Sequence, residues 1–414
     1  MHIVHLTQST TAEITGGVEY HVAYLTAALQ RLGHQVTVVN TTLLAPEACA
    51  APVGSPVHVP VNGSRRPADF LQRWDATLET AAMFIRRLVR QRHAARVAAH
   101  VANLAPDVVH QHGYVGELRA CWLLAKKFPL VFTNHTGAYL HLDRCLPTRW
   151  LQRRWMRRFT MVIGPSGELT PRTPNGRYVP NGVDTATFFP LSTGARSSLA
   201  VTHDTVDRRV FLCARRWAPT KGIVHLARAM RRLPPSVKER SVFLFAGNAT
   251  PGYRRYQQHV YQELAACGCD VRVLGNLEHQ RMADLVNLAD VCLLPSLMEA
   301  TSLACLEAMA CAKPVIGTRV GGLLELIRPG ETGWLVPAGD EAALADAIRE
   351  VSQATTAALQ RIGANALEIV RARYTWEATA LQTELIYQEA LRARSAEDRR
   401  QGHSRGTLLP TAVE

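Results

Sequence analysis

Short apolar strands alternate with amphipathic helices along almost the whole chain, and this alternation restricts the fold more than any other feature. Between strand candidates at residues 3–6 and 36–39, apolar residues from Val18 to Leu32 recur at four- and three-residue spacing, which predicts a helix. Further apolar runs that fit buried strands lie at 108–111, 130–133, 161–164, 210–214, 242–246, 271–274, 291–294 and 315–318. This pattern predicts an α/β fold with two doubly wound Rossmann-like domains that face each other across a cleft.

The length of 414 residues fits two domains, and Pro180, Gly182 and Pro190 mark a linker between the two halves. A long helix is expected near 375–393, followed by a polar tail without regular structure. The expected parts are an N-terminal domain (1–185), a C-terminal domain (186–375), a last helix (376–394) and a disordered tail (395–414).

Charge is unevenly distributed along the chain. Residues 1–190 hold 20 Lys and Arg against 11 Asp and Glu, a net charge of +9, whereas the remainder carries +4. A basic N-terminal half suits an anionic partner, such as nucleic acid, phospholipid or a phosphorylated acceptor. Six arginines in 144–158 stand beside Trp150 and Trp155, and a second arginine-rich segment covers 86–96. These segments predict either a solvated basic face or a surface that docks on anionic membrane.

The scattered cysteines lack the spacing of a zinc or disulfide framework, and the chain begins directly with a strand candidate. No apolar run approaches the roughly 18–20 residues that a membrane span needs. We therefore expect a cytoplasmic protein without a signal peptide, and its basic segments also allow a peripheral position on the inner face of the membrane.

The stretch PSLMEATSLACLEAMACAKP (295–314) carries the strongest candidate site residues. It predicts a strand, a loop and then a helix capped by Thr301 or Ser302, with Glu299 in the loop and Glu307 on the helix. This arrangement suits an elongated ligand whose negative charge lies at the helix N-terminus. Two solvated glutamates that bind nothing are the alternative.

Other candidates follow strands or open helices. Gly16 and Gly17 open the first helix, where they fit either a phosphate-binding turn or a plain tight turn. They do not form G-x-G-x-x-G, so the dinucleotide fingerprint is absent. His112 and His135 follow strands of the first half, where ligand groups of parallel sheets gather, although a buried histidine of structural role also fits His135.

Several motifs together resemble the family-4 retaining glycosyltransferases, which have the GT-B fold. EATSLACLE fits the E-x7-E signature of this family, and RWAPTKG resembles its arginine–lysine loop. GGVEYHVAYLTAALQRLGHQVTVV, VPNGVD, GGLLELI and TGWLVPAGD are similar to family segments at the matching places. The resemblance spans about residues 1–390, with one departure: Arg215 stands where the family usually has glycine. It also implies that the last helix (376–394) packs back on the first domain.

The resemblance implies transfer of a hexosyl group from a nucleoside-diphosphate sugar to an acceptor hydroxyl, with retention and without metal or another cofactor. The implied catalytic residues are Glu299, Lys221, Arg216 and His135, and the implied donor-binding residues are Gly16, Gly17, Arg216, Lys221, Leu277, Glu299, Ser302, Leu303 and Glu307. Among these, Arg216 and Lys221 would bind the diphosphate, Glu307 the ribose and Glu299 the transferred sugar. His112, Arg149 and Arg153 are candidates for acceptor binding.

The chemistry supports these roles without the family name. A diphosphate leaving group develops negative charge, which two cations and a helix N-terminus stabilise. A carboxylate accepts both hydroxyl protons of a vicinal diol. The expected acceptor is a glycan, glycolipid or small molecule, in cell-surface glycan, glycolipid or secondary-metabolite synthesis.

Other functions remain open. A nucleotide-sugar epimerase or a phosphorylase would keep the same fold, and donor incubated with water alone would reveal an epimerase. A basic nucleic-acid-binding protein is a more distant alternative, although no helix-turn-helix, RRM or zinc pattern is present. A nicotinamide dehydrogenase is disfavoured by the missing glycine fingerprint.

Overall fold

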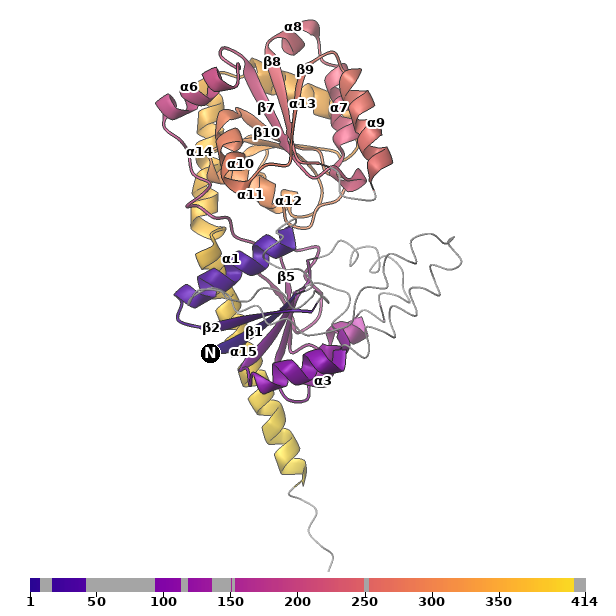
Figure 1. Ribbon diagram of the computed structural model, residues 1–414, viewed down its shortest axis with the longest axis vertical. Coiled ribbons are helices and arrows are strands. Elements are labelled where there is room, and N and C mark those ends of the chain that lie inside the picture. The colour runs from indigo at the N-terminus through magenta and orange to yellow at the C-terminus, as the bar shows by residue number, and fades with distance from the viewer. Residues whose placement is uncertain are drawn as a thin grey trace, which may run out of the picture. The chain divides into compact units, whose positions relative to one another are not determined.

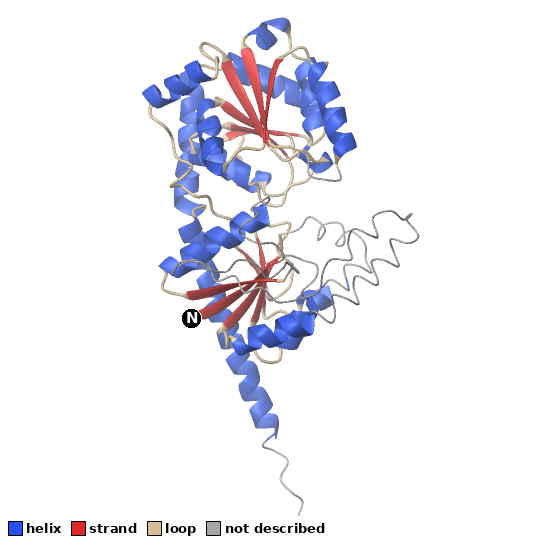
Figure 2. Cartoon of the chain, in the orientation of Figure 1, coloured by secondary structure: helices blue, strands red, loops and turns tan. Residues whose placement is uncertain are grey.

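A computed structural model describes residues 1–7, 17–41, 94–112, 118–135, 150, 153–248 and 253–405. The chain forms two compact units, Met1–Val179 with Thr379–Glu414, and Pro180–Ala378. In each unit a sheet lies among helices (Figures 1 and 2). In the described residues both sheets have six strands, and every strand pair there is parallel, as the alternating pattern predicts.

The first unit has the strand order β2-β1-β3-β4-β5-β6. Its described strands are β1 (His2–Thr7), β2 (Gln35–Asn40), β3 (Val108–His112), β4 (Leu130–Thr133), β5 (Met161–Gly164) and β6 (Gly176–Tyr178), and its helices include α1 (Gly17–Arg31), α3 (Leu118–Leu124) and the part of α15 (Trp376–Arg405) from Thr379 onward. Helix α1 buries Val22, Leu25 and Leu29, members of the apolar stripe expected from the sequence. Gly33 follows this helix at a φ of +85°, a conformation that favours glycine.

The second unit has the strand order β12-β11-β10-β7-β8-β9. Its strands are β7 (Arg209–Ala214), β8 (Ser241–Ala246), β9 (Asp270–Gly275), β10 (Val291–Leu294), β11 (Val315–Thr318) and β12 (Gly333–Val336). Its described helices are α6 (Thr193–Thr202), the 3-10 turn η2 (Pro219–Lys221), α7 (Ile223–Arg231), α8 (Pro235–Glu239), α9 (Arg254–Ala265), α10 (His279–Leu288), α11 (Leu303–Ala310), α12 (Leu323–Leu326), α13 (Glu341–Gln353) and α14 (Thr356–Arg373).

Helices cover both faces of the second sheet. Successive residues of a strand point to opposite faces, so both sets of side chains are buried. Val210 and Leu212 of β7 join one apolar cluster, with residues of α10, α11 and α14. Phe211 and Cys213, which alternate with them, join a second cluster with residues of α7, α9 and α13. Figure 1 shows these two sets of helices on opposite sides of the sheet. The continuous apolar runs seen in the sequence follow from this two-sided burial.

Each sheet contains a point where the strand order reverses. In the second unit, β10 lies beside β7 although two strands, β8 and β9, come between them in the sequence. In the first unit, β3 lies on the opposite side of β1 from β2. Loops that leave adjacent strands at such a point diverge and leave room for a ligand beyond the carboxyl ends. Functional side chains are therefore expected at these two edges.

Helix α15 is anchored to the first unit through a buried tyrosine. The Tyr387 hydroxyl lies 2.6 Å from His110 Nδ1 and 3.2 Å from His5 Nε2, on two neighbouring strands. Arg177 forms an ion pair with Glu389, and Arg394 donates to the carbonyl oxygens of Ala125 and Lys126. Contacts from β1, β3, β6 and the end of α3 thus fix one helix.

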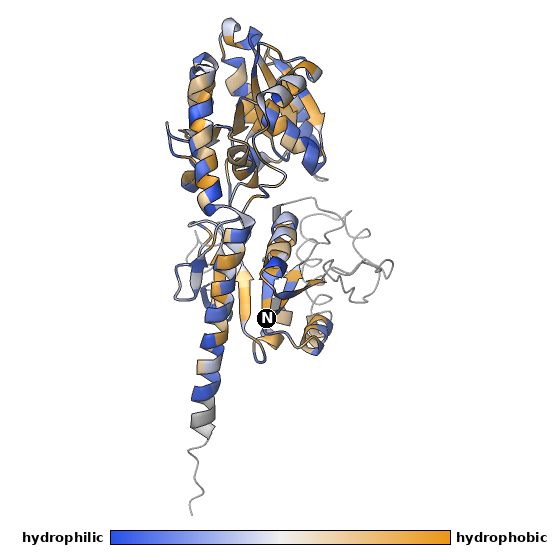
Figure 3. Ribbon diagram, turned by 90° about the vertical axis from the view of Figure 1, so that its left-hand side faces the viewer, coloured by the Kyte–Doolittle hydropathy of each residue, from blue (hydrophilic) through white to orange (hydrophobic). Residues whose placement is uncertain are grey.

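The predicted disordered tail begins inside this helix, since α15 continues to Arg405 and residues 406–414 lie outside the described part. Arg394, whose side chain also pairs with Asp398 one turn later, holds the helix beyond the expected end. Figure 3 shows mostly hydrophilic colour in this C-terminal part, which is why composition alone favoured a tail. None of the described helices has the length and apolar character needed to cross a membrane.

We predict that Tyr387→Phe destabilises the protein. The change leaves one or both of the buried His5 and His110 ring nitrogens without the hydroxyl that they contact, at a cost of about 1–3 kcal/mol. The thermal midpoint should fall by several degrees, since about 1 kcal/mol corresponds to roughly 2–4 °C in a domain of this size. Tyr253→Phe, at an exposed position, is the control. A loss no larger than that of the control would contradict the anchoring role.

Candidate active site

The candidate site lies beyond the carboxyl ends of β7 and β10 in the second unit. The loop after β7 carries Arg215, Arg216 and Lys221, and the loop after β10 carries Glu299. Because β7 and β10 are hydrogen-bonded neighbours at the point of strand reversal, segments about 80 residues apart in sequence converge there.

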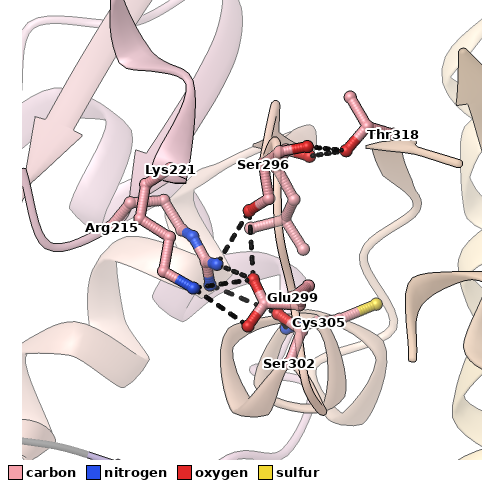
Figure 4. Close-up of polar contacts among 8 residues, drawn as sticks. Arg215, Lys221, Ser296, Glu299, Ser302, Cys305 and Thr318 are labelled. Carbon is pink, nitrogen blue, oxygen red and sulfur yellow. Dashed lines mark hydrogen bonds and ion pairs between the residues drawn. The ribbon is translucent and has the colours of Figure 1, made fainter. Parts of the chain in front are cut away.

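Glu299 is the centre of a buried polar cluster (Figure 4). Its carboxylate forms an ion pair with Arg215 and accepts hydrogen bonds from Lys221 Nζ, at 3.0 Å to Oε1 and 3.1 Å to Oε2. The Ser296 hydroxyl donates to Oε2 at 3.0 Å and accepts from Arg215 Nη2 at 2.9 Å. One carboxylate thus lies between two cations.

These contacts keep the Glu299 carboxylate ionised. Burial raises the pKa of this carboxyl, but the charges of Arg215 and Lys221 and the hydrogen bonds from Lys221 and Ser296 outweigh burial and lower the pKa to about 2. Burial and the neighbouring Arg215 charge lower the pKa of Lys221 to about 8, although Glu299 opposes this. At neutral pH the cluster therefore holds a carboxylate and two cations.

Two glycines allow neighbouring loops, those after β7 and β11, to approach the loop after β10. Gly222 has a φ of +65°, and a Cβ atom there would lie 1.9 Å from the Pro295 carbonyl oxygen. Gly321 has a φ of +47°, and its Cβ would lie 1.7 Å from the Glu299 carbonyl oxygen. No other residue fits either position without displacing the backbone that carries Glu299.

Helix α11 begins at the same place. Ser302 is its N-cap, and its hydroxyl accepts from Cys305 N–H at 3.3 Å and from Arg215 Nη1 at 3.2 Å. Leu303 is the first helical residue, and Glu307 lies half-buried one turn further along. Burial raises the pKa of Glu307 to about 7, while the Arg215 charge opposes the rise. The charge of Arg215 therefore favours the ionised form of both predicted glutamates.

Arg215 is the residue that sequence reasoning did not assign to the site. It is buried and contacts Glu299, Ser296 and Ser302, whereas Arg216 is exposed. Among the described residues, the Arg216 side chain forms no ion pair, although its charge helps to lower the pKa of Lys221. Its place in the sequence could have indicated this role, because Arg215 and Ser296 are polar residues that follow the adjacent strands β7 and β10.

The remaining predicted donor residues are less informative. Leu277 follows β9 and packs against the first apolar cluster, and Gly17 is the exposed first residue of α1. Gly16 and Arg149 lie outside the described residues, and Arg153 is exposed. Roles for these residues in donor or acceptor binding stay predictions.

His112 and His135 belong to a group of histidines in the first unit. His112 ends β3 and is buried, whereas His135 follows β4 and is half-buried, with 3.3 Å between His112 Nδ1 and His135 Nε2. His5, His21 and His110 pack around them, with ring centroids of contacting pairs 4.0–5.5 Å apart. Burial, with repulsion among the rings, holds the pKa of His112 and His135 well below the usual value, so both are neutral at pH 7.

The arginine- and tryptophan-containing segment is only partly described. Trp150 is 65% exposed, with the Arg154 guanidinium 5.8 Å from its ring centroid. Trp155 instead packs edge-to-face on Trp122, which also lies beneath Arg158. Of the aromatic residues expected to anchor a membrane dock, Trp155 is thus engaged within the unit. Membrane docking stays a prediction.

Two parallel α/β units, one with a cation–carboxylate cluster beside a helix N-terminus, form an arrangement that suits a phosphorylated ligand. Comparison with protein families identifies the class: residues 15–187 match "Glycosyltransferase Family 4" and residues 200–368 match "Glycosyl transferases group 1". The chain therefore belongs to the family-4 glycosyltransferases, retaining hexosyltransferases that use nucleotide-sugar donors and have the GT-B fold.

Full-length relatives and solved structures agree with this assignment. The chain is 29% identical to the D-inositol 3-phosphate glycosyltransferase of Xylanimonas cellulosilytica, over 96% of this chain and 97% of that protein. It is 28% identical to the alpha-maltose-1-phosphate synthase of Mycobacterium tuberculosis, over 94% and 99%. Sucrose-phosphate synthase of Thermosynechococcus elongatus has the same fold, with a TM-score of 0.75, 24% identity and coverage of 95% and 99%. Anabaena HepE, solved with UDP and glucose, gives a TM-score of 0.70 at 19% identity, over 93% and 98%.

We predict that Arg215→Gln raises the pKa of Glu307 above its value of about 7. Arg215 is the charge that favours the ionised form of this carboxyl, so its removal leaves burial unopposed. A carbon-13 NMR titration of the glutamate carboxyl groups, assigned with Glu307→Gln, measures the midpoint. Arg216→Gln removes the adjacent exposed charge and should leave that midpoint unchanged. Equal shifts of the Glu307 midpoint in the two variants would contradict a specific effect of Arg215 on this carboxyl.

Proposed function

We propose that this enzyme transfers a glucosyl or related hexosyl group from a UDP-linked sugar to a hydroxyl of a small phosphorylated acceptor, with retention of anomeric configuration. The observation that carries the proposal is the ionised Glu299 carboxylate held between Arg215 and Lys221 at the start of α11. Such a cluster offers the Lys221 cation to a diphosphate and carboxylate oxygens to sugar hydroxyls within one site.

UDP-glucose is the first donor to test. Anabaena HepE, which shares the fold, has been solved with UDP-glucose as well as with UDP and glucose. In the proposed site, Lys221 and the exposed Arg216 bind the diphosphate, and the N–H groups of Ser302 and Leu303 at the start of α11 add to its stabilisation. Glu307 accepts the two ribose hydroxyls in its ionised form.

In this proposal Arg215 positions Glu299 and does not bind the diphosphate. Its guanidinium is already committed to Glu299, Ser296 and Ser302, whereas Arg216 is exposed beside Lys221. Glu299, fixed in this way, receives the hydroxyls of the transferred sugar while the anomeric C–O bond breaks. The electrons of that bond go to the diphosphate, where Lys221 and Arg216 offset the new charge.

The acceptor proposal rests on charge and on the relatives' names. Three of the similar proteins are named for a phosphorylated polyol or sugar: inositol 3-phosphate, maltose 1-phosphate and sucrose phosphate. The N-terminal 190 residues of this chain carry a net charge of +9, which favours an anionic acceptor. Glycans, glycolipids and membrane-linked acceptors are the other candidates that the basic first unit accommodates.

We predict glycosyl transfer from UDP-glucose that continues in the presence of EDTA, and a loss of about 10²-fold or more in turnover for Lys221→Ala. Removal of one preorganised group that stabilises developing charge typically has this effect. UDP release with a panel of sugar and polyol phosphates measures the rate, and the proton coupling of the product anomeric centre reports its configuration.

Lys238→Ala is the matched control, because Lys238 lies on α8 and donates to the Arg231 and Cys267 carbonyl oxygens, away from the cluster. Near-normal turnover of Lys221→Ala would remove this lysine from the mechanism. An inverted product would contradict retaining transfer, and isomerised donor without acceptor would favour an epimerase.

A further inference from the structure

The first unit holds a second cluster of side chains with distinct chemistry, apart from the cluster around Glu299. His21 on α1, His112 at the end of β3 and His135 after β4 each offer one ring nitrogen, and the three nitrogens lie within 4.8 Å of one another. His21 and His112 are buried, and His135 is half-buried. No carboxylate or cysteine belongs to this group in the described part of the chain. Neutral imidazole is the form of histidine that binds transition metals.

A second group consists of His5, His110 and His112, whose ring nitrogens also lie within 4.8 Å of one another. Two of its members, however, contact hydroxyl groups. Both ring nitrogens of His110 lie within 2.7 Å of a hydroxyl, those of Tyr387 and Thr133. His5 contacts the Thr26 hydroxyl at 3.1 Å and the Tyr387 hydroxyl at 3.2 Å. These hydrogen bonds explain the buried positions of His5 and His110 without a ligand. The group of His21, His112 and His135 is therefore the better metal candidate.

The distances within that group also fit a metal ion. The 3.3 Å between His112 Nδ1 and His135 Nε2 is long for a hydrogen bond. Two imidazole nitrogens bound to one tetrahedral Zn²⁺ at about 2.0–2.1 Å lie roughly 3.3–3.4 Å apart. The other ring nitrogen of His112, Nε2, is buried and has no hydrogen-bond partner among the described residues, so their hydrogen bonds leave this imidazole only partly satisfied.

The third ligand requires only a small adjustment. Three atoms within 4.8 Å of one another have a common point no more than about 2.8 Å from each, so contraction by less than an ångström per ligand reaches Zn–N bonding distance. His135 is half-buried, whereas the other two histidines are buried. Three histidines with one open position form a familiar coordination set for zinc.

We propose that His21, His112 and His135 form a binding site for one divalent transition metal ion, with Zn²⁺ as the best-fitting probe. An all-imidazole set favours Zn²⁺, Ni²⁺ or Cu²⁺ over Mg²⁺ or Ca²⁺, which prefer oxygen ligands. The site lies at the carboxyl ends of β3 and β4, the edge of the first sheet where ligands gather. The ion is not assigned a step in sugar transfer, so the expectation of transfer in EDTA stands beside it.

The test is Zn²⁺ titration of the full-length protein after treatment with EDTA and its removal, followed by calorimetry. We expect one Zn²⁺ per chain, and at least ~10-fold weaker binding in His112→Ala and in His135→Gln, since loss of a ligand exceeds the 10–100-fold effect of outer-shell changes. Co²⁺ in place of Zn²⁺ should give the visible absorption of a four-coordinate ion, and Mg²⁺ should give no saturable binding. Circular dichroism tests whether each variant is folded. We expect His135→Gln to disturb folding least, because His135 is only half-buried.

His259→Gln is the matched control for adventitious binding, because His259 lies on the exposed side of α9 with its Nε2 atom 3.5 Å from Glu263. This variant should bind Zn²⁺ like the parent protein. The proposal is overturned by the absence of 1:1 binding, by normal binding in both cluster variants, or by loss of binding in His259→Gln instead. The titration contains neither donor nor acceptor, so its outcome is independent of the proposed transfer reaction.

Discussion

The ion pair between Arg215 and Glu299, extended by Lys221, is the interaction on which the candidate site depends. A buried carboxylate is strongly disfavoured unless cations and hydrogen bonds replace the lost water, and here two cations and a serine hydroxyl do so. The pair joins the loops after β7 and β10. Gly222 permits that approach, and Gly321 lets the loop after β11 lie against the backbone of Glu299. Removal of Glu299 would leave two cations without their carboxylate, and removal of Arg215 would leave the carboxylate with Lys221 alone, so the pair links the two loops.

Much of the fold follows from patterns in the sequence. The apolar runs predicted strands because parallel strands buried on both faces need no polar residues, and α1 follows its 4-3 spacing. The end of α15 was predicted less well, because its polar residues are held by contacts with Ala125 and Lys126, far away in sequence. Local composition carries no information about such contacts.

The candidate site was predictable only in part. Glu299, Lys221 and Ser302 were found because their spacing matched motifs, and the structure brings these three together with Arg215 between them. The role of Arg215 depends on which side chain at the end of β7 turns inward, and this is decided by packing against Ser296 and Ser302. The histidine group likewise depends on the register of β3 and β4 and on the placement of α1, which no linear motif encodes.

The most direct test of the account is calorimetric titration of UDP into Glu307→Ala and Glu299→Ala, combined with transfer rates. The account predicts that Glu307→Ala weakens UDP binding about 10-fold or more, as expected for loss of hydrogen bonds to a charged group. Glu299→Ala should bind UDP no more weakly than the parent protein but lose turnover, because its carboxylate serves the transferred sugar. Equal losses of UDP affinity in the two variants would contradict the account.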